Sequence, residues 1–299
     1  MKAETKVSLP ESEEKTSSYS RNVMIQKIIR HVICILLCVV SLFPFYITVI
    51  NATRTNVAIQ QGLSLIPSTN IITNIQNLFD KASALGTPIY RCFLNSAMIA
   101  VPATLFSVYF SSLTAYGVFA YNFKLRRFAW SFVLGIMMIP GQVTSVGFYQ
   151  FMLKLGLNDS YLPLIIPAIA APTTVFFMRQ FMKASLPLEI IDAARIDGSG
   201  EFKTFNTIVL PLLKPAIATQ AIFAFIANWN NLYMPQLILK TQTKYTLPMF
   251  VAQLKGDQFR ADYGVIYAAL LVTIVPMLIF YLILSKYIIA GVALGGVKE

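Results

Sequence analysis

One polar segment, residues 187–215, gathers acidic, small and turn-forming residues in a chain that is 56% hydrophobic. It reads PLEIIDAARIDGSGEFKTFNTIVLPLLKP and carries charges of both signs. Acidic side chains near the positive end of a helix stabilise it, and consecutive alanines leave its surface nearly bare. The segment therefore predicts a short exposed helix with a negatively charged, small-residue face. The residues that form this face and its end are Glu189, Asp192, Ala193, Ala194, Asp197 and Gly198.

The end of this short helix is predicted at Asp197-Gly198, because glycine adopts the left-handed backbone conformation that terminates helices. A second helix is expected to follow at once. Its apolar residues, Phe202, Phe205, Val209 and Leu212, recur at spacings of three and four and so share one face. The pattern predicts a surface helix, a turn, and a helix that enters the membrane.

A second group of candidate residues consists of uncharged polar side chains and one indole inside long apolar runs. Amides supply the donors and acceptors that sugar hydroxyls need, and an indole can stack on the C–H face of a sugar. The alternative is that the amides join neighbouring helices and that the tryptophan packs in the core or at the membrane interface. The candidate substrate-pathway residues are Gln142, Gln220, Asn228, Trp229, Asn230 and Asn231.

Catalytic, cofactor-binding and metal-binding residues are not predicted. The single His and the three Cys, which include no CxxC pair, do not suggest a metal site or a disulfide framework. An intramembrane hydrolase would need a nucleophile with a base, or paired carboxylates, at membrane depth. The chain also lacks a GxxxxGK[ST] phosphate loop, so it is not expected to hydrolyse ATP alone. Ionisable residues are scarce within the apolar runs, which argues against ion-coupled transport.

The elements that must position these residues are membrane helices. Only 12% of the 299 residues are charged, and the mean hydropathy is +0.64. Such a composition predicts an all-α integral membrane protein. We expect residues 1–28 to be a disordered tail and residues 29–299 to form one membrane domain. Six spans are predicted, near residues 31–50, 93–120, 128–153, 161–181, 208–237 and 264–288.

The net charge of +11 bears on orientation rather than on nucleic-acid binding. Six spans place both termini on one side, and about two thirds of the 24 Lys and Arg residues fall on that side. Because cytoplasmic loops carry an excess of positive charge, we expect both termini and the 187–215 segment to be cytoplasmic.

The polar segment resembles the cytoplasmic EAA loop of permease subunits of ABC importers. Asp192-Ala193-Ala194, Asp197-Gly198 and Leu210-Pro211 stand in the places of that pattern. Asp192 replaces the usual Glu, and Ser199 stands where Ala is common. Further short motifs resemble the subgroup that imports carbohydrates with an external binding protein: Leu155–Asn158, Arg179–Phe181, Trp229-Asn230, Thr246–Pro248 and Gly291–Lys298. Ala290 departs from the basic residue often found there.

The resemblance implies a type I ABC importer permease in the cell membrane, with a coupling loop at about residues 182–210. Glu189, Asp192, Ala193, Ala194, Asp197 and Gly198 would then form the coupling helix that docks an ATPase. Implied partners are a second homologous permease, two ATPase subunits that bind ATP and Mg²⁺, and an extracellular solute-binding protein. The implied substrate is a sugar or oligosaccharide. An ATP-independent channel or facilitator is the alternative.

Overall fold

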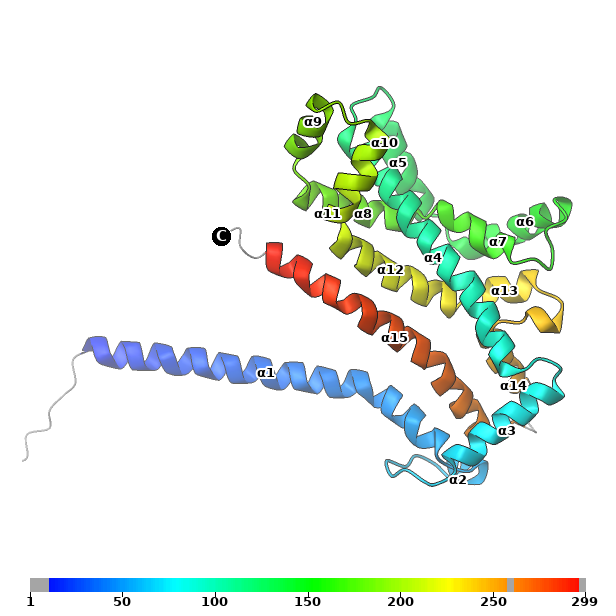
Figure 1. The fold of residues 1–299 in the computed structure, drawn as a ribbon. Coiled ribbons are helices and arrows are strands. Elements are labelled where there is room, and N and C mark those ends of the chain that lie inside the picture. The colour runs from blue at the N-terminus through cyan, green and yellow to red at the C-terminus, as the bar shows by residue number, and fades with distance from the viewer. Residues whose placement is uncertain (1–10, 257–260, 296–299) are drawn as a thin grey trace, which may run out of the picture.

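The computed structural model describes residues 11–256 and 261–295, with side chains for residues 23–256 and 261–288. Within these ranges the chain forms helices and turns and no strand (Figure 1). The first ten residues, residues 257–260 and the side chains of the Gly291–Lys298 motif lie outside them. The elements are α1 (Glu11–Ala52), α2 (Asn56–Gln60), α3 (Ile71–Ala84), α4 (Ile89–Ala120), α5 (Arg126–Met137), α6 (Gly141–Lys154), α7 (Leu162–Ile165), η1 (Ile166–Ile169), α8 (Pro172–Ser185), α9 (Leu188–Ile196), α10 (Glu201–Thr204), η2 (Phe205–Val209), α11 (Leu210–Leu212), α12 (Lys214–Trp229), α13 (Tyr233–Ile238), η3 (Gln242–Lys244), α14 (Leu247–Leu254) and α15 (Tyr263–Gly295).

Four helical segments of the described chain are long and apolar enough to cross a membrane. They are Val23–Ala52, Ile89–Ala120, Leu162–Ser185 and Tyr263–Ile288. Two bent helix pairs raise the number to as many as six if each pair is one span. The described chain is thus an all-helical, multi-pass membrane protein, and each predicted span overlaps one of these segments.

Both bent pairs are broken beside proline. The α5–α6 pair bends by 96° just before Gly141, where Pro140 lacks the N–H that would continue the helix. The third predicted span, near residues 128–153, is therefore bent. The second bend, of 82°, separates α11 from α12 at Leu213, between Pro211 and Pro215.

The fifth predicted span, residues 208–237, is wrong at both ends. Its straight part is α12, which begins at Lys214 after the 82° bend and ends at Trp229. After α12, the separate helix α13 begins at Tyr233, and Asn231 accepts a hydrogen bond from the backbone N–H of Met234 in its first turn. Hydrogen bonds from a short amide side chain to the nearby backbone compete with helix continuation, which apolar periodicity alone does not reveal.

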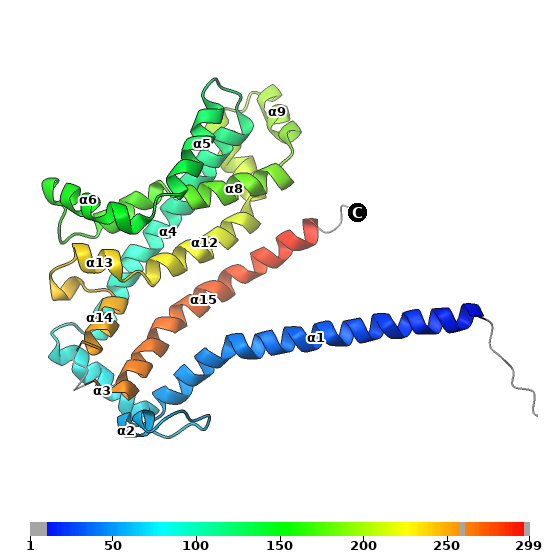
Figure 2. The same cartoon turned by 180° about the vertical axis from the view of Figure 1, so that it is seen from behind.

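The first helix differs from expectation at its start. It begins at Glu11, so residues 11–28 are helical where composition predicts a disordered tail. Extending an existing helix costs less than nucleating one, because each added residue forms one more hydrogen bond. The first half of α1 stands apart from the other helices in both views (Figures 1 and 2).

The core is built around α4 and α12. Helix α4 packs against α8 and α12, and α12 packs against α15. Helix α1 packs against α15. Figure 1 shows α9 and the C-terminal end of α15 toward one end of the molecule, and α2, α3 and α14 at the opposite end. The polar segment and the 53–88 connection therefore lie at opposite ends of the bundle.

Candidate functional site

Helix α9 forms the surface element that the sequence predicts. It begins after Pro187 and spans Leu188–Ile196. Its inward face buries Ile191 and Ala194, and Ile191 joins a core cluster with residues of α4, α8 and η2. Its outward face exposes both charged and apolar side chains: Leu188, Glu189, Asp192, Ala193 and Ile196. The inward face of α9 is therefore packed against the core, and its outward face is exposed.

The end of α9 is a complete Schellman turn. The N–H of Gly198 donates to the carbonyl of Arg195, and the N–H of Ser199 donates to that of Ala194. Gly198 has φ +76°, a left-handed conformation that glycine adopts freely, that Asn and Asp adopt occasionally, and that other residues disfavour. An added Cβ at Gly198 would meet no neighbour within 4 Å. The glycine is therefore required by the backbone, and the space above it is open.

An ionic link joins α9 to two other helices. Arg195 Nε donates to Glu201 Oε1 at 2.7 Å, and Arg195 also donates to Asp192 Oδ1 at 3.0 Å. The other carboxylate oxygen of Glu201 accepts a hydrogen bond from the hydroxyl of Tyr116 at 3.1 Å. The guanidinium carbon lies 5.4 Å from the ring centre of Tyr121, at the end of α4. These contacts tie α9 to α10 and α4.

The predicted coupling residues thus divide into two sets. Five of the six, Glu189, Asp192, Ala193, Asp197 and Gly198, are exposed around the outward face and its terminating turn. Ala194 is buried, so its small side chain serves packing within the chain. Sequence reasoning missed Ile196, which is 87% exposed, and the Arg195–Glu201–Tyr116 link. The spacing of four from Leu188 to Asp192 to Ile196 was a usable signal for the face.

Three cavities line one side of α12 in series. The first, of about 280 Å³, includes Thr219 and Gln220; the second, of about 490 Å³, includes Gln220 and Ala224. The third, of about 340 Å³, includes Asn228 and Asn231 and reaches α6 and α7. Because Gln220, Ala224 and Asn228 recur every four residues, they share one face of α12. We call this face the α12 cavity face.

The candidate pathway residues are only partly brought together. Gln220 and Asn228 lie on the α12 cavity face, and Asn231, just beyond α12, lines the third cavity. Gln142 is exposed beside the third cavity, whose lining includes its neighbours Gly141 and Thr144. Asn230 is turned toward α15, where its amide contacts Met277 Sδ at 3.2 Å.

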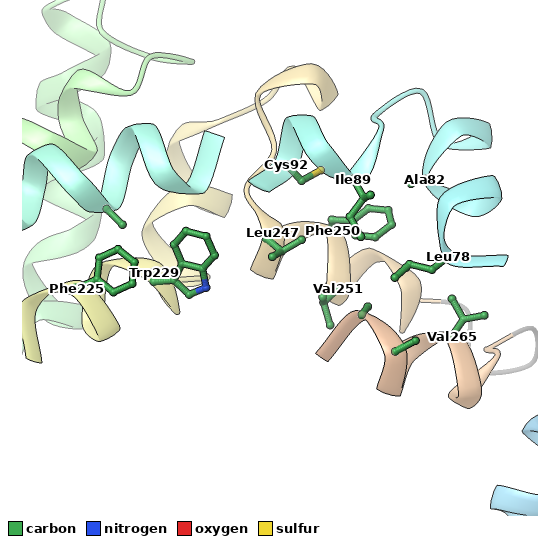
Figure 3. Packing of buried hydrophobic residues seen from close by; sticks show 13 residues of the cluster. Leu78, Ala82, Ile89, Cys92, Phe225, Trp229, Leu247, Phe250, Val251 and Val265 are labelled. Atoms are coloured by element: carbon green, nitrogen blue, oxygen red, sulfur yellow. The ribbon is translucent and has the colours of Figure 1, made fainter. Parts of the chain in front are cut away.

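Trp229 packs in the core of the chain. It is 2% exposed, and its Nε1 donates to the carbonyl of Thr273 at 3.0 Å. The indole packs against Phe93 and Phe225, and Trp229 and Phe225 belong to the buried cluster drawn in Figure 3. The alternative stated from the sequence, that this tryptophan packs in the core, is confirmed.

A carboxylate clamp lies toward the opposite end from α9. Asp159, at φ +54°, accepts hydrogen bonds from the N–H groups of Lys240 and Thr241, from the Thr241 hydroxyl, and from Lys244 Nζ at 2.9 Å. Partial burial raises the pKa of this carboxyl, but these four donors outweigh it and hold the pKa well below its usual range. The clamp fixes the η3 loop against the α6–α7 turn. Within the described residues, no group of three or more His, Cys, Asp or Glu is placed to hold a metal ion.

Comparison with known proteins points in one direction. Residues 107–293 match a family model described as binding-protein-dependent transport system inner membrane component. The chain is 36% identical over 262 residues to the arabinooligosaccharides transport system permease protein AraQ of Halalkalibacterium halodurans, across 87% of this chain and 92% of that one. It is 31% identical over 272 residues to the sn-glycerol-3-phosphate transport system permease protein UgpE of Escherichia coli (strain K12), across 88% and 95%.

The fold is also shared with a solved structure. A chain in the crystal structure of a bacterial ABC transporter involved in import of the acidic polysaccharide alginate superposes with a TM-score of 0.73. The match covers 89% of this chain and 98% of that chain, at 20% sequence identity. At this identity the likeness concerns the fold.

Proposed function

This chain belongs to the family of binding-protein-dependent transport system inner membrane components, and from that premise we propose that it is the permease subunit of an ATP-driven importer of a sugar or oligosaccharide. Family membership together with the outward face of α9 carries the proposal. Exposed apolar side chains beside carboxylates, on a helix that caps the bundle, suit a protein partner better than water.

We assign the docking of a cytoplasmic ATPase to that outward face. Leu188 and Ile196 supply apolar contacts, while Glu189 and Asp192 supply negative charge for a basic groove. The open space above Gly198 allows close approach of a partner backbone. Two ATPase subunits, one for each of two paired permeases, would bind ATP and Mg²⁺ and supply the energy.

The ionic link gives this docking a route into the membrane. A displacement of α9 would be transmitted to α10 through the Arg195–Glu201 contact, and to α4 through the Glu201–Tyr116 contact. The helix then continues from α10 through the π-helix η2 to the bend at Leu213. π-Helical turns and proline-flanked bends are places where helices change shape. ATP-driven closure of the ATPases would move α12 relative to α4 by this route.

The α12 cavity face is our candidate for this chain's share of the substrate pathway. Its amides, from Gln220 and Asn228, together with the hydroxyl of Thr144 on α6 across the third cavity, match the hydrogen-bonding needs of a carbohydrate. Phe177 and Phe223 add apolar surface for the C–H groups of a sugar ring. A second, homologous permease would complete the pathway.

The orientation follows from charge and from this docking role. We propose six spans with both termini and α9 in the cytoplasm, which places α2, α3 and α14 on the extracellular side. An extracellular solute-binding protein would deliver substrate there. The two relatives named above are permeases for arabinooligosaccharides and for sn-glycerol-3-phosphate, so we commit to the carbohydrate class and not to one sugar.

Uptake of labelled oligosaccharide by cells with and without this gene tests the proposal, with and without depletion of ATP. We expect uptake to require both the gene and ATP. Uptake that requires the gene but persists after ATP depletion would favour a facilitator and contradict an ATP-driven importer.

A further inference from the structure

A short loop at the end of the molecule opposite α9 exposes apolar side chains. Residues 62–66 read Gly-Leu-Ser-Leu-Ile and connect α2 to the segment before α3. Leu63 is 70% exposed and Ile66 is 76% exposed, with Leu65 also on the surface. Three large apolar side chains exposed within four residues form a patch that water does not favour. We call residues 62–66 the apolar loop.

The apolar loop folds back along the first membrane-spanning helix. The hydroxyl of Tyr46 donates to the carbonyl of Leu65 at 2.7 Å. Tyr46 lies six residues before the end of α1 at Ala52, which is roughly 9 Å along a helix. The loop therefore lies beside the helix and not beyond its tip.

The surface of α1 at this level is itself apolar and exposed. Leu42, Phe45, Tyr46 and Val49 recur at spacings of three and four, and all four are exposed. They belong to the candidate span Val23–Ala52. Only 6% of the most apolar 18-residue stretch of this span is buried within the molecule. Lipid covers such a stripe in a membrane, and a tyrosine near the end of a span is typical of the headgroup level.

The apolar loop is held in this position by its base. Gly62 has φ +125°, and its carbonyl accepts a hydrogen bond from Arg54 Nη1 at 3.0 Å. Arg54 Nη2 donates to the carbonyl of Ala58. The Thr53 hydroxyl accepts a hydrogen bond from the N–H of Ser68 at 2.8 Å. These hydrogen bonds hold the two ends of the loop, and the side chains of Leu63, Leu65 and Ile66 are exposed.

We propose that the apolar loop inserts Leu63, Leu65 and Ile66 into the headgroup and upper acyl region of the lipid bilayer. The continuity of these side chains with the exposed stripe of α1 supports a lipid surface over a protein partner. The anchor would hold the end of α1 at a fixed depth. Asn74 of α3 donates to the carbonyls of Ala52 and Arg54, so the same anchor would also position α3.

Site-directed spin labelling of the full chain tests this insertion. Cys34, Cys38 and Cys92 are replaced by alanine, and single cysteines are introduced by Ile66→Cys, Leu63→Cys, Leu42→Cys and Gln60→Cys. Leu42→Cys is the lipid-facing control on the exposed stripe of α1. Gln60→Cys, at the exposed last residue of α2, is the polar control. The purified chain is reconstituted into vesicles of phosphatidylcholine and phosphatidylglycerol. Collision of the labels with oxygen and with a water-soluble nickel chelate is then measured.

Insertion predicts that labels at positions 63 and 66 collide several-fold more with oxygen than with nickel, as at position 42, while position 60 shows the reverse. Labels at positions 63 and 66 that behave like position 60 would overturn the proposal. Protection of both positions from both reagents would mean that a protein covers the loop, and it would equally overturn the lipid assignment. The readout does not depend on transport, so its failure is distinguishable from failure of the importer proposal.

Discussion

Arg195 and Glu201 face each other across the turn that ends α9, with 2.7 Å between Nε and Oε1. Their side chains are partly exposed, so the pair contributes little to stability, about 1 kcal/mol or less. Its position matters more than its strength. It joins the proposed docking helix to α10, and through the Tyr116 hydroxyl it reaches α4.

Breaking this pair should separate ATPase binding from transport. In Glu201→Gln the charge on the acceptor is lost while its shape is kept, and we expect uptake to fall by about tenfold, a coupling change of about 1.4 kcal/mol. The ATPase should still copurify, because the outward face of α9 is unchanged. Tyr116→Phe should give a smaller fall, since it removes one of the two links. Normal uptake in Glu201→Gln would show that motion does not pass through this carboxylate.

A substitution at the α9 turn tests docking. Gly198→Asp adds bulk and charge in the open space above α9, and we expect uptake and ATPase copurification to be lost while membrane insertion is kept. The matched control is Gly156→Asp. Gly156 ends α6 with φ +69° and also has nothing within 4 Å of an added Cβ, so both variants carry similar backbone strain of about 1 kcal/mol. Equal loss of copurification in both variants would point to strain and not to docking.

Gln220 and Trp229 should behave differently, although both lie on α12. Gln220→Leu changes the α12 cavity face, so we expect altered uptake kinetics with little change in thermal stability. Trp229→Phe removes a buried hydrogen bond and part of the core packing, which should cost about 2 kcal/mol of folding free energy. Its substrate concentration for half-maximal uptake should stay unchanged. Uptake kinetics and melting temperatures of the two variants decide the matter.

The Asp159 clamp predicts a defined pH dependence. Because the pKa of this carboxyl is lowered in the folded chain, its stabilising effect is complete above its ordinary value of about 3.9 and is lost as pH falls through the lower folded value. Asp159→Asn should therefore lower the melting temperature, by the equivalent of about 1–3 kcal/mol. The difference from wild type should be constant from about pH 5 to 8 and shrink below about pH 4. A difference that grows on acidification would contradict the clamp.

The spans and the short helix α9 follow from the sequence because apolar run length, proline and glycine act locally. Pro140 marks a bend and Gly198 marks a helix end for the same reason. The end of α12 at Trp229 falls inside a stretch, residues 216–234, that contains no proline or glycine, and the burial of Ala194 depends on packing against distant helices. Neither is visible in a local pattern.

The candidate site illustrates the same limit. Gln220 and Asn228 are eight residues apart and so share a helical face, whereas Trp229 is turned by about 100° from Asn228. Helical spacing was therefore sufficient to separate Trp229 from the α12 cavity face. The contacts of Glu201 with Tyr116 join residues that are 85 positions apart, and no single-sequence pattern contains them.

Purification of the tagged chain from its native host, followed by mass spectrometry, tests the docking of an ATPase on α9 most directly. Three chains are compared: wild type, Ile196→Asp, and Ile72→Asp. Both isoleucines are well exposed, but Ile196 lies on the outward face of α9 and Ile72 lies on α3 at the opposite end. We predict that a second permease and an ATPase copurify with wild type and with Ile72→Asp, and that the ATPase is lost from Ile196→Asp. An ATPase retained by Ile196→Asp, or a wild-type chain that purifies without one, would contradict the docking role of α9.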